Sequence, residues 1–62
     1  MNLAKLKGLL SQNNYSQKYL CKLLNVSQTT IYKKMHGKVD FKSNELLMIC
    51  KKFNVSMQYF FD

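Results

Sequence analysis

The sequence predicts an all-α protein, a compact bundle of five short helices that forms one domain over residues 1–62. The chain has no proline and only two glycines, so little in it interrupts helices. Apolar residues recur at helical spacing in several segments. A chain of 62 residues that is 47% hydrophobic supplies one core, without room for a second domain or a deep catalytic cleft.

The five expected helices follow from apolar periodicity bounded by capping and turn residues. We expect them over residues 2–12, 17–24, 27–36, 43–53 and 56–61. Serine stands at the start of most of these segments and asparagine at the end of several, which suits N-caps and left-handed helix ends respectively. Phe41 is expected to anchor the loop over residues 37–42.

The charge is strongly positive, at +7, and every one of the ten cationic residues is lysine. Such an excess favours polyanions, with nucleic acid first and an acidic protein or membrane surface second. Because arginine is absent, its bidentate contact to guanine is excluded. Bases would have to be recognised by amide, hydroxyl and ammonium groups.

The two cysteines, Cys21 and Cys50, lie in apolar helical segments and are expected to be free core thiols, with a disulfide as the alternative. Together with His36 they lack a zinc-ligand spacing, so no metal or other cofactor is expected. No apolar run approaches the length of about 20 residues that spans a membrane, and no secretory signal is recognisable. We therefore expect an intracellular protein.

Residues 16–37 carry the most information about function, because they predict two short helices joined by a tight turn. The second helix would be apolar on its back, at Ile31 and Met35. Its front would carry hydrogen-bonding side chains, namely Gln28, Thr29, Tyr32 and Lys33. On a basic small protein, such a helix suits the major groove of DNA.

An ordered set of residues here resembles the lambda-repressor-like helix-turn-helix family, which includes phage repressors, Cro and XRE-type regulators. The matching residues are Ser16-Gln17, Leu20, Cys21, Leu24, Val26-Ser27-Gln28, Ile31, Gly37-Lys38 and Asn54-Val55-Ser56. The resemblance covers nearly the whole chain. It implies a sequence-specific transcription regulator that binds double-stranded operator DNA in the cytoplasm of a bacterium or a phage-infected host.

The chain departs from the family pattern at three positions. Asn25 stands where glycine is common, which should cost little because asparagine accepts positive φ. Lys34 replaces an apolar residue, and Met35 is expected to take the apolar role. Lys42 replaces the usual Ser or Thr cap before Glu45, so we expect the cap to move to Ser43. The pattern around Tyr32 and Phe41 resembles phage and prophage regulators.

The expected base contacts are Gln28 with adenine, Thr29 with a base or a thymine methyl, Lys33 with guanine or phosphate, and Tyr32 with sugar or thymine. The alternative is that these residues only form the solvated face of a helix. The expected phosphate contacts are Ser16, Gln17, His36, Lys38 and Lys42. For these, the alternatives are a simple helix cap at residues 16–17 and an ordinary surface histidine at position 36.

Relatives bind as dimers on two half-sites, so a homodimer, perhaps formed only on DNA, is one expectation. Its candidate contacts are Met48, Met57, Tyr59, Phe60 and Phe61. The alternative is that most of them complete the core, which is favoured for at least one of the two terminal phenylalanines. A monomeric binder, or a domain of a longer repressor, also fits the sequence.

Other functions fit the sequence less well. A protein-interaction module of antitoxin or anti-repressor type could use the same fold, and would show only weak affinity for DNA. Several short helices around a closed core argue against a membrane-active cationic peptide. One histidine, three acidic residues and no glycine-rich phosphate loop make an enzyme, or a small-molecule substrate, improbable.

Overall fold

The computed structural model describes residues 1–61 as a bundle of helices with no strand among them. Residues 1–61 contain four α-helices, which are α1 (Leu3–Gln12), α2 (Gln17–Leu24), α3 (Gln28–Met35) and α4 (Ser43–Phe53). A 3₁₀ turn, η1 (Met57–Phe60), follows them. The all-helical prediction is confirmed, with each α-helix boundary within one residue of the expected position.

The expected fifth α-helix is the one element that differs. The backbone bonds of η1 span three residues, from the Tyr59 amide to the Ser56 carbonyl and from the Phe61 amide to the Gln58 carbonyl. This is the tighter 3₁₀ pattern, which is usual in runs of three or four residues. The turn places Phe60 into the core, and the Asn2 amide donates to the Phe60 carbonyl at 2.6 Å, which ties the start of the chain to η1.

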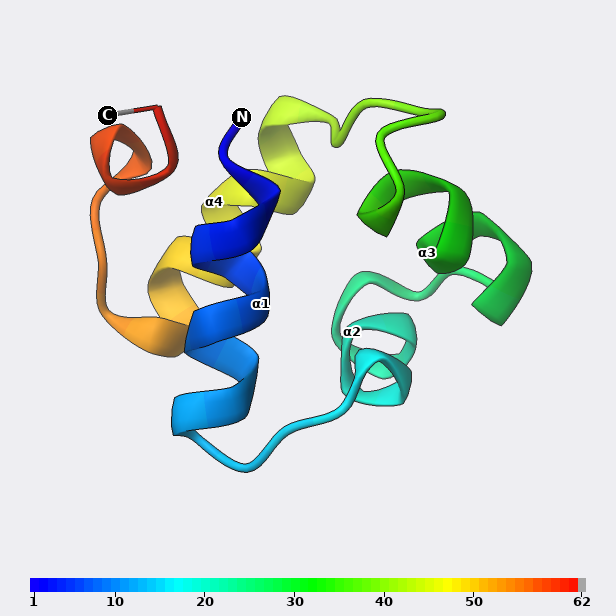
Figure 1. Ribbon diagram of the computed structural model, residues 1–62, viewed down its shortest axis with the longest axis horizontal. Helices are drawn as coiled ribbons and strands as arrows, with labels where there is room; N and C mark the ends of the chain where they lie inside the picture. The colour runs from blue at the N-terminus through cyan, green and yellow to red at the C-terminus, as the bar shows by residue number, and fades with distance from the viewer. Residues whose placement is uncertain (62) are drawn as a thin grey trace.

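All five elements contribute side chains to one apolar core. Its fully enclosed members are Leu6, Leu20, Ile31, Met35, Ile49 and Phe60. Burying each such side chain stabilises the fold by about 1.5–3 kcal/mol. Helices α1 and α4 and the turn η1 form one side of the bundle, and α2 and α3 lie together on the other (Figure 1).

Asparagine occupies the left-handed conformation at three chain reversals, with φ of 61° at Asn14, 57° at Asn25 and 56° at Asn54. Asn25 and Asn54 end α2 and α4 as C-caps, and Asn14 follows the end of α1. Asparagine tolerates this region better than most residues other than glycine. The left-handed role predicted for Asn25 is confirmed, so the turn between α2 and α3 forms without glycine.

The start of α4 corrects one expectation, the position of its N-cap. The cap is Lys42 rather than Ser43, and the Glu45 carboxylate accepts a hydrogen bond from the Lys42 amide at 2.8 Å. Met35 is fully buried, as expected for its apolar role, and the Lys34 side chain is buried as well. A charged residue can occupy that position because Glu45 lies opposite it.

Candidate nucleic-acid interface

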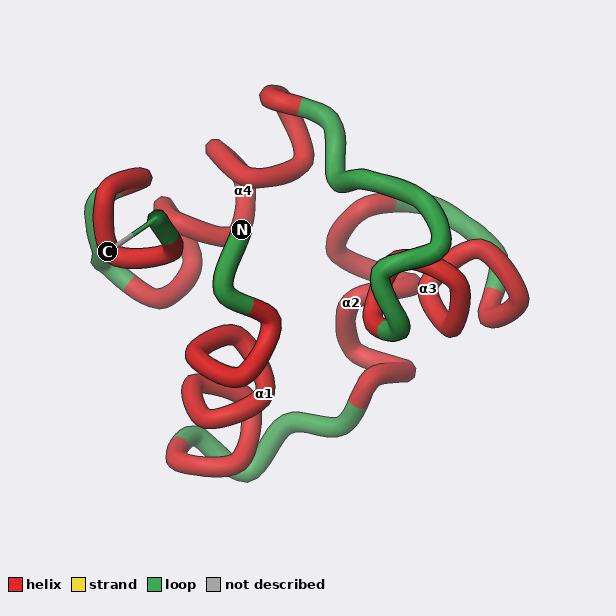
Figure 2. Tube along the Cα trace, turned by 45° about the horizontal axis from the view of Figure 1, so that its top comes forward, coloured by secondary structure: helices red, strands yellow, loops and turns green. Residues whose placement is uncertain are grey.

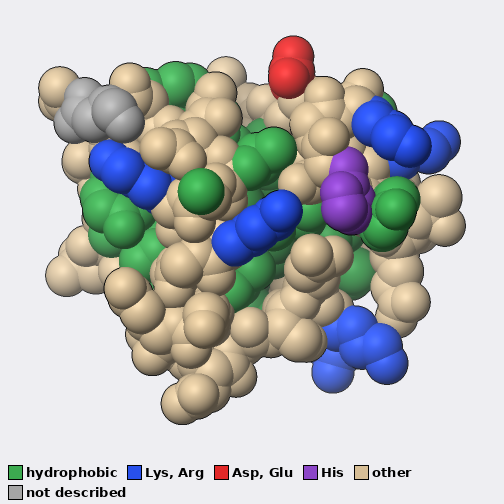
Figure 3. Space-filling model, in the orientation of Figure 1, with side chains coloured by type: hydrophobic (Ala, Val, Ile, Leu, Met, Phe, Trp, Pro, Cys, Tyr) green, Lys and Arg blue, Asp and Glu red, His purple; other side chains and the backbone are tan. Residues whose placement is uncertain are grey.

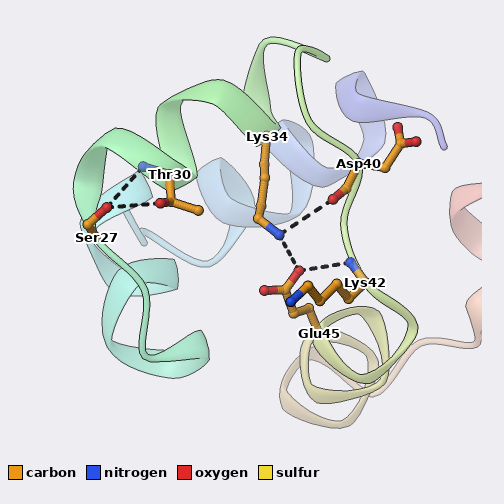
Figure 4. A network of polar contacts seen from close by, with 6 residues as sticks. All are labelled: Ser27, Thr30, Lys34, Asp40, Lys42 and Glu45. Atoms are coloured by element: carbon orange, nitrogen blue, oxygen red, sulfur yellow. Dashed lines mark hydrogen bonds and ion pairs between the residues drawn. The ribbon is translucent and has the colours of Figure 1, made fainter.

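Helices α2 and α3 form a helix-turn-helix, lying side by side in both views of the chain (Figures 1 and 2). The amides of Asn25 and Val26 both donate to the Cys21 carbonyl and so close the end of α2. Ser27 then caps α3, since its hydroxyl accepts from the Thr30 amide at 3.1 Å and donates to the Thr30 hydroxyl at 3.0 Å (Figure 4). The turn therefore sets the orientation of α3 relative to α2.

The two faces of α3 differ as the sequence predicts. On the back, Ile31 is 1% exposed and Met35 is fully buried. On the front, the side chains predicted to contact bases are all exposed, namely Gln28, Thr29, Tyr32 and Lys33. The helix is therefore anchored by its apolar side and free to hydrogen-bond on the other.

A hollow joins the first turns of α2 and α3. We call it the α2–α3 hollow, and it is lined by Gln17, Lys18, Cys21, Gln28, Thr29, Ile31 and Tyr32. The structure thus brings the predicted phosphate contact Gln17 next to three of the four predicted base contacts. Lys33 is exposed but lies outside this hollow.

The start of α2 faces solvent. Ser16 takes the extended N-cap conformation, and its hydroxyl makes no capping bond. The first-turn amides of a helix have no partner within that helix, and the helix dipole favours an anion near them. Residues Ser16 and Gln17 also line a second hollow with Lys7, which comes from α1.

Lys7 and Lys18 each line a hollow that contains Gln17. Helical spacing directs Lys18 away from the apolar face of α2, toward solvent or phosphate, and its side chain is exposed. No sequence signal could have indicated Lys7, because its place depends on how α1 packs beside the start of α2.

The end of α3 carries the other predicted phosphate contacts, His36, Lys38 and Lys42, and all three are exposed. Gly37 turns the chain at φ 76°, and the Lys38 amide then donates back to the Lys33 carbonyl at 2.9 Å. The rings of Tyr32 and His36 lie 4.1 Å apart between centroids. The front of α3 and the 37–42 loop therefore form one continuous polar and aromatic surface.

A buried ion pair lies behind this surface (Figure 4). The residues Lys34 and Glu45 are 3% and 6% exposed, and the Lys34 ammonium lies 2.5 Å from a carboxylate oxygen of Glu45. Burial raises the pKa of Glu45, but hydrogen bonds from Lys34 and from the Lys42 amide, with the charges of both lysines, lower that pKa by more. The pKa of Glu45 therefore lies below its ordinary value, so its carboxyl group is ionised at neutral pH.

The residues predicted as dimer contacts fall into three groups. Met48 and Phe61 are exposed, at 40% and 57%, whereas Met57 and Tyr59 are partly buried against the core. Phe60 is fully buried and contacts Tyr59 edge-on, so its assignment to a dimer surface is wrong. It belongs to the core because η1 turns its ring inward.

Lysines predominate among the charged side chains visible on the face shown in Figure 3, in keeping with the net charge of +7. Among residues 1–61, no three histidine, cysteine or acidic side chains come together as metal ligands. Within the same residues, no helix has both the length and the apolar character needed to cross a membrane.

The fold and the exposed polar front of α3 place the protein in the class of helix-turn-helix DNA-binding domains. The model of the Cro/C1-type HTH DNA-binding domain matches residues 5–61, and the chain belongs to that family. No curated protein and no solved structure matched the chain significantly in the two other comparisons.

Proposed function

We propose that this protein is a sequence-specific regulator of transcription that inserts α3 into the major groove of operator DNA. The observation that carries this proposal is the division of α3 into an enclosed apolar back and an exposed polar front. A second support is the α2–α3 hollow, since it places the start of α2 beside the start of α3. In this motif, the first helix crosses the DNA backbone while the second contacts bases.

Base recognition would rest on the four exposed front residues. Gln28, at the first position of α3, can pair with adenine through both groups of its amide. Thr29 offers a hydroxyl or a methyl group beside it, and Lys33 offers an ammonium one turn further on. Tyr32, held against His36, would contact sugar or a thymine methyl.

Phosphate contacts would flank α3 on both sides. Ser16 and Gln17 present the free amides of the first turn of α2. His36, Lys38 and Lys42 supply donors at the other end, and all are exposed. Phosphate contacts fix register and orientation, while base contacts select the sequence.

One domain of this size covers a short half-site, so we infer that two copies bind a two-fold symmetric operator. The side chains available for contact between the copies are Met48, Met57, Tyr59 and Phe61. The resemblance of the residues around Tyr32 and Phe41 to phage and prophage regulators favours a Cro or repressor role, in the cytoplasm of a bacterial or phage-infected cell.

The direct test is selection of bound sequences from random duplex DNA, followed by a salt titration of the best site. We expect a two-fold symmetric consensus, and an affinity for it about 10³-fold or more above that for random DNA. Enrichment of no sequence, together with a steep salt dependence, would instead identify a non-specific DNA binder. Tight, salt-insensitive binding to a protein with only weak DNA affinity would favour an interaction module.

A further inference from the structure

The 37–42 loop, which carries Lys38 and Lys42, is held to the rest of the protein in two different ways. Its first half is attached through backbone bonds to the end of α3. The Gly37 amide donates to the Lys34 carbonyl, and the Lys38 and Val39 amides donate to the Lys33 carbonyl. These bonds involve no side chain, so they do not depend on the residue at position 34 or 45.

The second half of the loop is held by side chains. The Lys34 ammonium donates to the Asp40 carbonyl at 3.4 Å and to Glu45. The same Glu45 oxygen accepts from the Lys42 amide at 2.8 Å. Within residues 1–61, Lys34 and Glu45 provide all the side-chain hydrogen bonds to this loop.

Stability alone does not account for this pair. A buried ion pair generally contributes little more than an apolar pair of similar volume, because both charges lose their hydration. The location instead indicates a geometric role, since Lys34 stands in the last turn of α3 and Glu45 in the first turn of α4. The ring of Phe41 lies 5.6 Å from the Lys34 ammonium, which adds a further contact to the loop.

We propose that Lys34 and Glu45 are positioning residues that hold Lys42 in place, relative to α3, for its contact with a DNA phosphate. This inference rests on the proposed function, because it takes Lys42 to be a phosphate contact. It makes a distinction between two lysines of one loop. Lys42 depends on the ion pair, whereas Lys38 is held by the backbone of α3 and does not.

The test combines the double variant Lys34→Met/Glu45→Gln with single alanine substitutions at Lys42 and Lys38. Methionine and glutamine preserve most of the volume, and glutamine still fits the first turn of α4. For each protein, the affinity for the selected operator is measured over a range of salt concentrations, and circular dichroism checks the helix content. The slope of log K against log salt falls by about 0.9 for each phosphate contact that is lost.

In the native background, Lys42→Ala and Lys38→Ala should each make that slope shallower by about 0.9. In the double variant, glutamine can still accept from the Lys42 amide, but the bonds made by Lys34 are lost, so Lys42→Ala should have a smaller effect on the slope than in the native protein. Lys38→Ala should keep its full effect. A general structural loss would not distinguish the two lysines in this way. Equal effects of Lys42→Ala in both backgrounds, or no effect in the native protein, would overturn the proposal.

A second variant, Glu45→Asp, covers the case in which the double variant does not fold. It keeps the negative charge but shortens the side chain by one methylene, so one carboxylate can no longer reach both Lys34 and the Lys42 amide. Lys42→Ala should then have a smaller effect than in the native protein, and an undiminished effect would contradict the proposal. Absence of specific binding by the native protein would instead refute the proposed function itself.

Discussion

Gln17 at the start of α2 and Gln28 at the start of α3 line the same hollow on the protein surface. The turn at Asn25, together with the packing of α2 against α3, brings these two helix starts together. A side chain suited to phosphate and a side chain suited to adenine therefore line one hollow. If α3 enters the major groove as proposed, contact of Gln17 with the DNA backbone would set the position from which Gln28 reaches a base.

Replacement of Gln28 by alanine should weaken binding to the selected operator by about 1–3 kcal/mol and relax the preference at one base pair. Its effect on random DNA should be small, because the lost contact is to a base. Fluorescence anisotropy with the operator and with a random duplex measures both. Gln12→Ala is a matched control, since Gln12 is exposed at the end of α1 and lines neither hollow at the interface. Equal losses on the two duplexes would refute the role assigned to Gln28.

Lys38→Ala should weaken binding to all duplexes alike, because a phosphate contact carries no sequence information. The salt dependence of log K should become shallower by about 0.9. Lys51→Ala removes the same charge from the last turn of α4 and serves as the control, for which we expect a smaller change. If the two variants behave identically, Lys38 acts only through net charge and makes no defined contact.

Local patterns predicted most of the fold. The four α-helices, the enclosed back of α3 and the left-handed Asn25 all follow from periodicity and capping within a few residues of sequence. The family resemblance is confirmed by the match over residues 5–61. The predicted base contacts are all exposed, which their function requires, although their contacts with DNA remain predictions.

The features that sequence analysis missed depend on residues far apart in the chain. Lys34 is buried because Glu45, on another helix, supplies a carboxylate, and no periodicity reveals that pairing. Sequence analysis favoured the core for at least one of the two terminal phenylalanines but could not choose between them, and Phe60 is the buried one because η1 packs against α1. Lys7 reaches the start of α2 through the arrangement of two helices. In each case the decisive partner lies on a different element.

The two thiols should differ in reactivity, and DNA should protect only one of them. Cys50 is buried, and burial raises the pKa of its thiol, so it should react slowly with a thiol reagent until the protein unfolds. Cys21 is partly exposed in the α2–α3 hollow, and its thiol donates weakly to the Gln17 carbonyl at 3.8 Å.

Cys21 should therefore react first, and saturating operator DNA should slow that reaction several-fold. Mass spectrometry of alkylated protein, with and without DNA, measures both rates, and Cys21→Ala should abolish the fast phase. Unchanged labelling of Cys21 in a saturated complex would place the DNA away from the α2–α3 hollow.

The Lys34–Glu45 pair should make the stability of the protein sensitive to acid. The pKa of Glu45 is lowered in the folded state from a reference value of 4.5, so its contribution to stability is complete above that value. The contribution is lost as the pH falls through the folded pKa, because protonation leaves the buried Lys34 ammonium without its counter-charge.

Urea unfolding between pH 7 and pH 3 should therefore show a decrease in the free energy of unfolding below about pH 4.5 for the native protein. The double variant Lys34→Met/Glu45→Gln should show a smaller decrease over the same range. Because the other carboxyl groups titrate in both proteins, the difference between the two curves isolates the pair. Parallel curves would mean that Glu45 titrates alike in the folded and unfolded chains, and that the ion pair adds no pH-dependent stability.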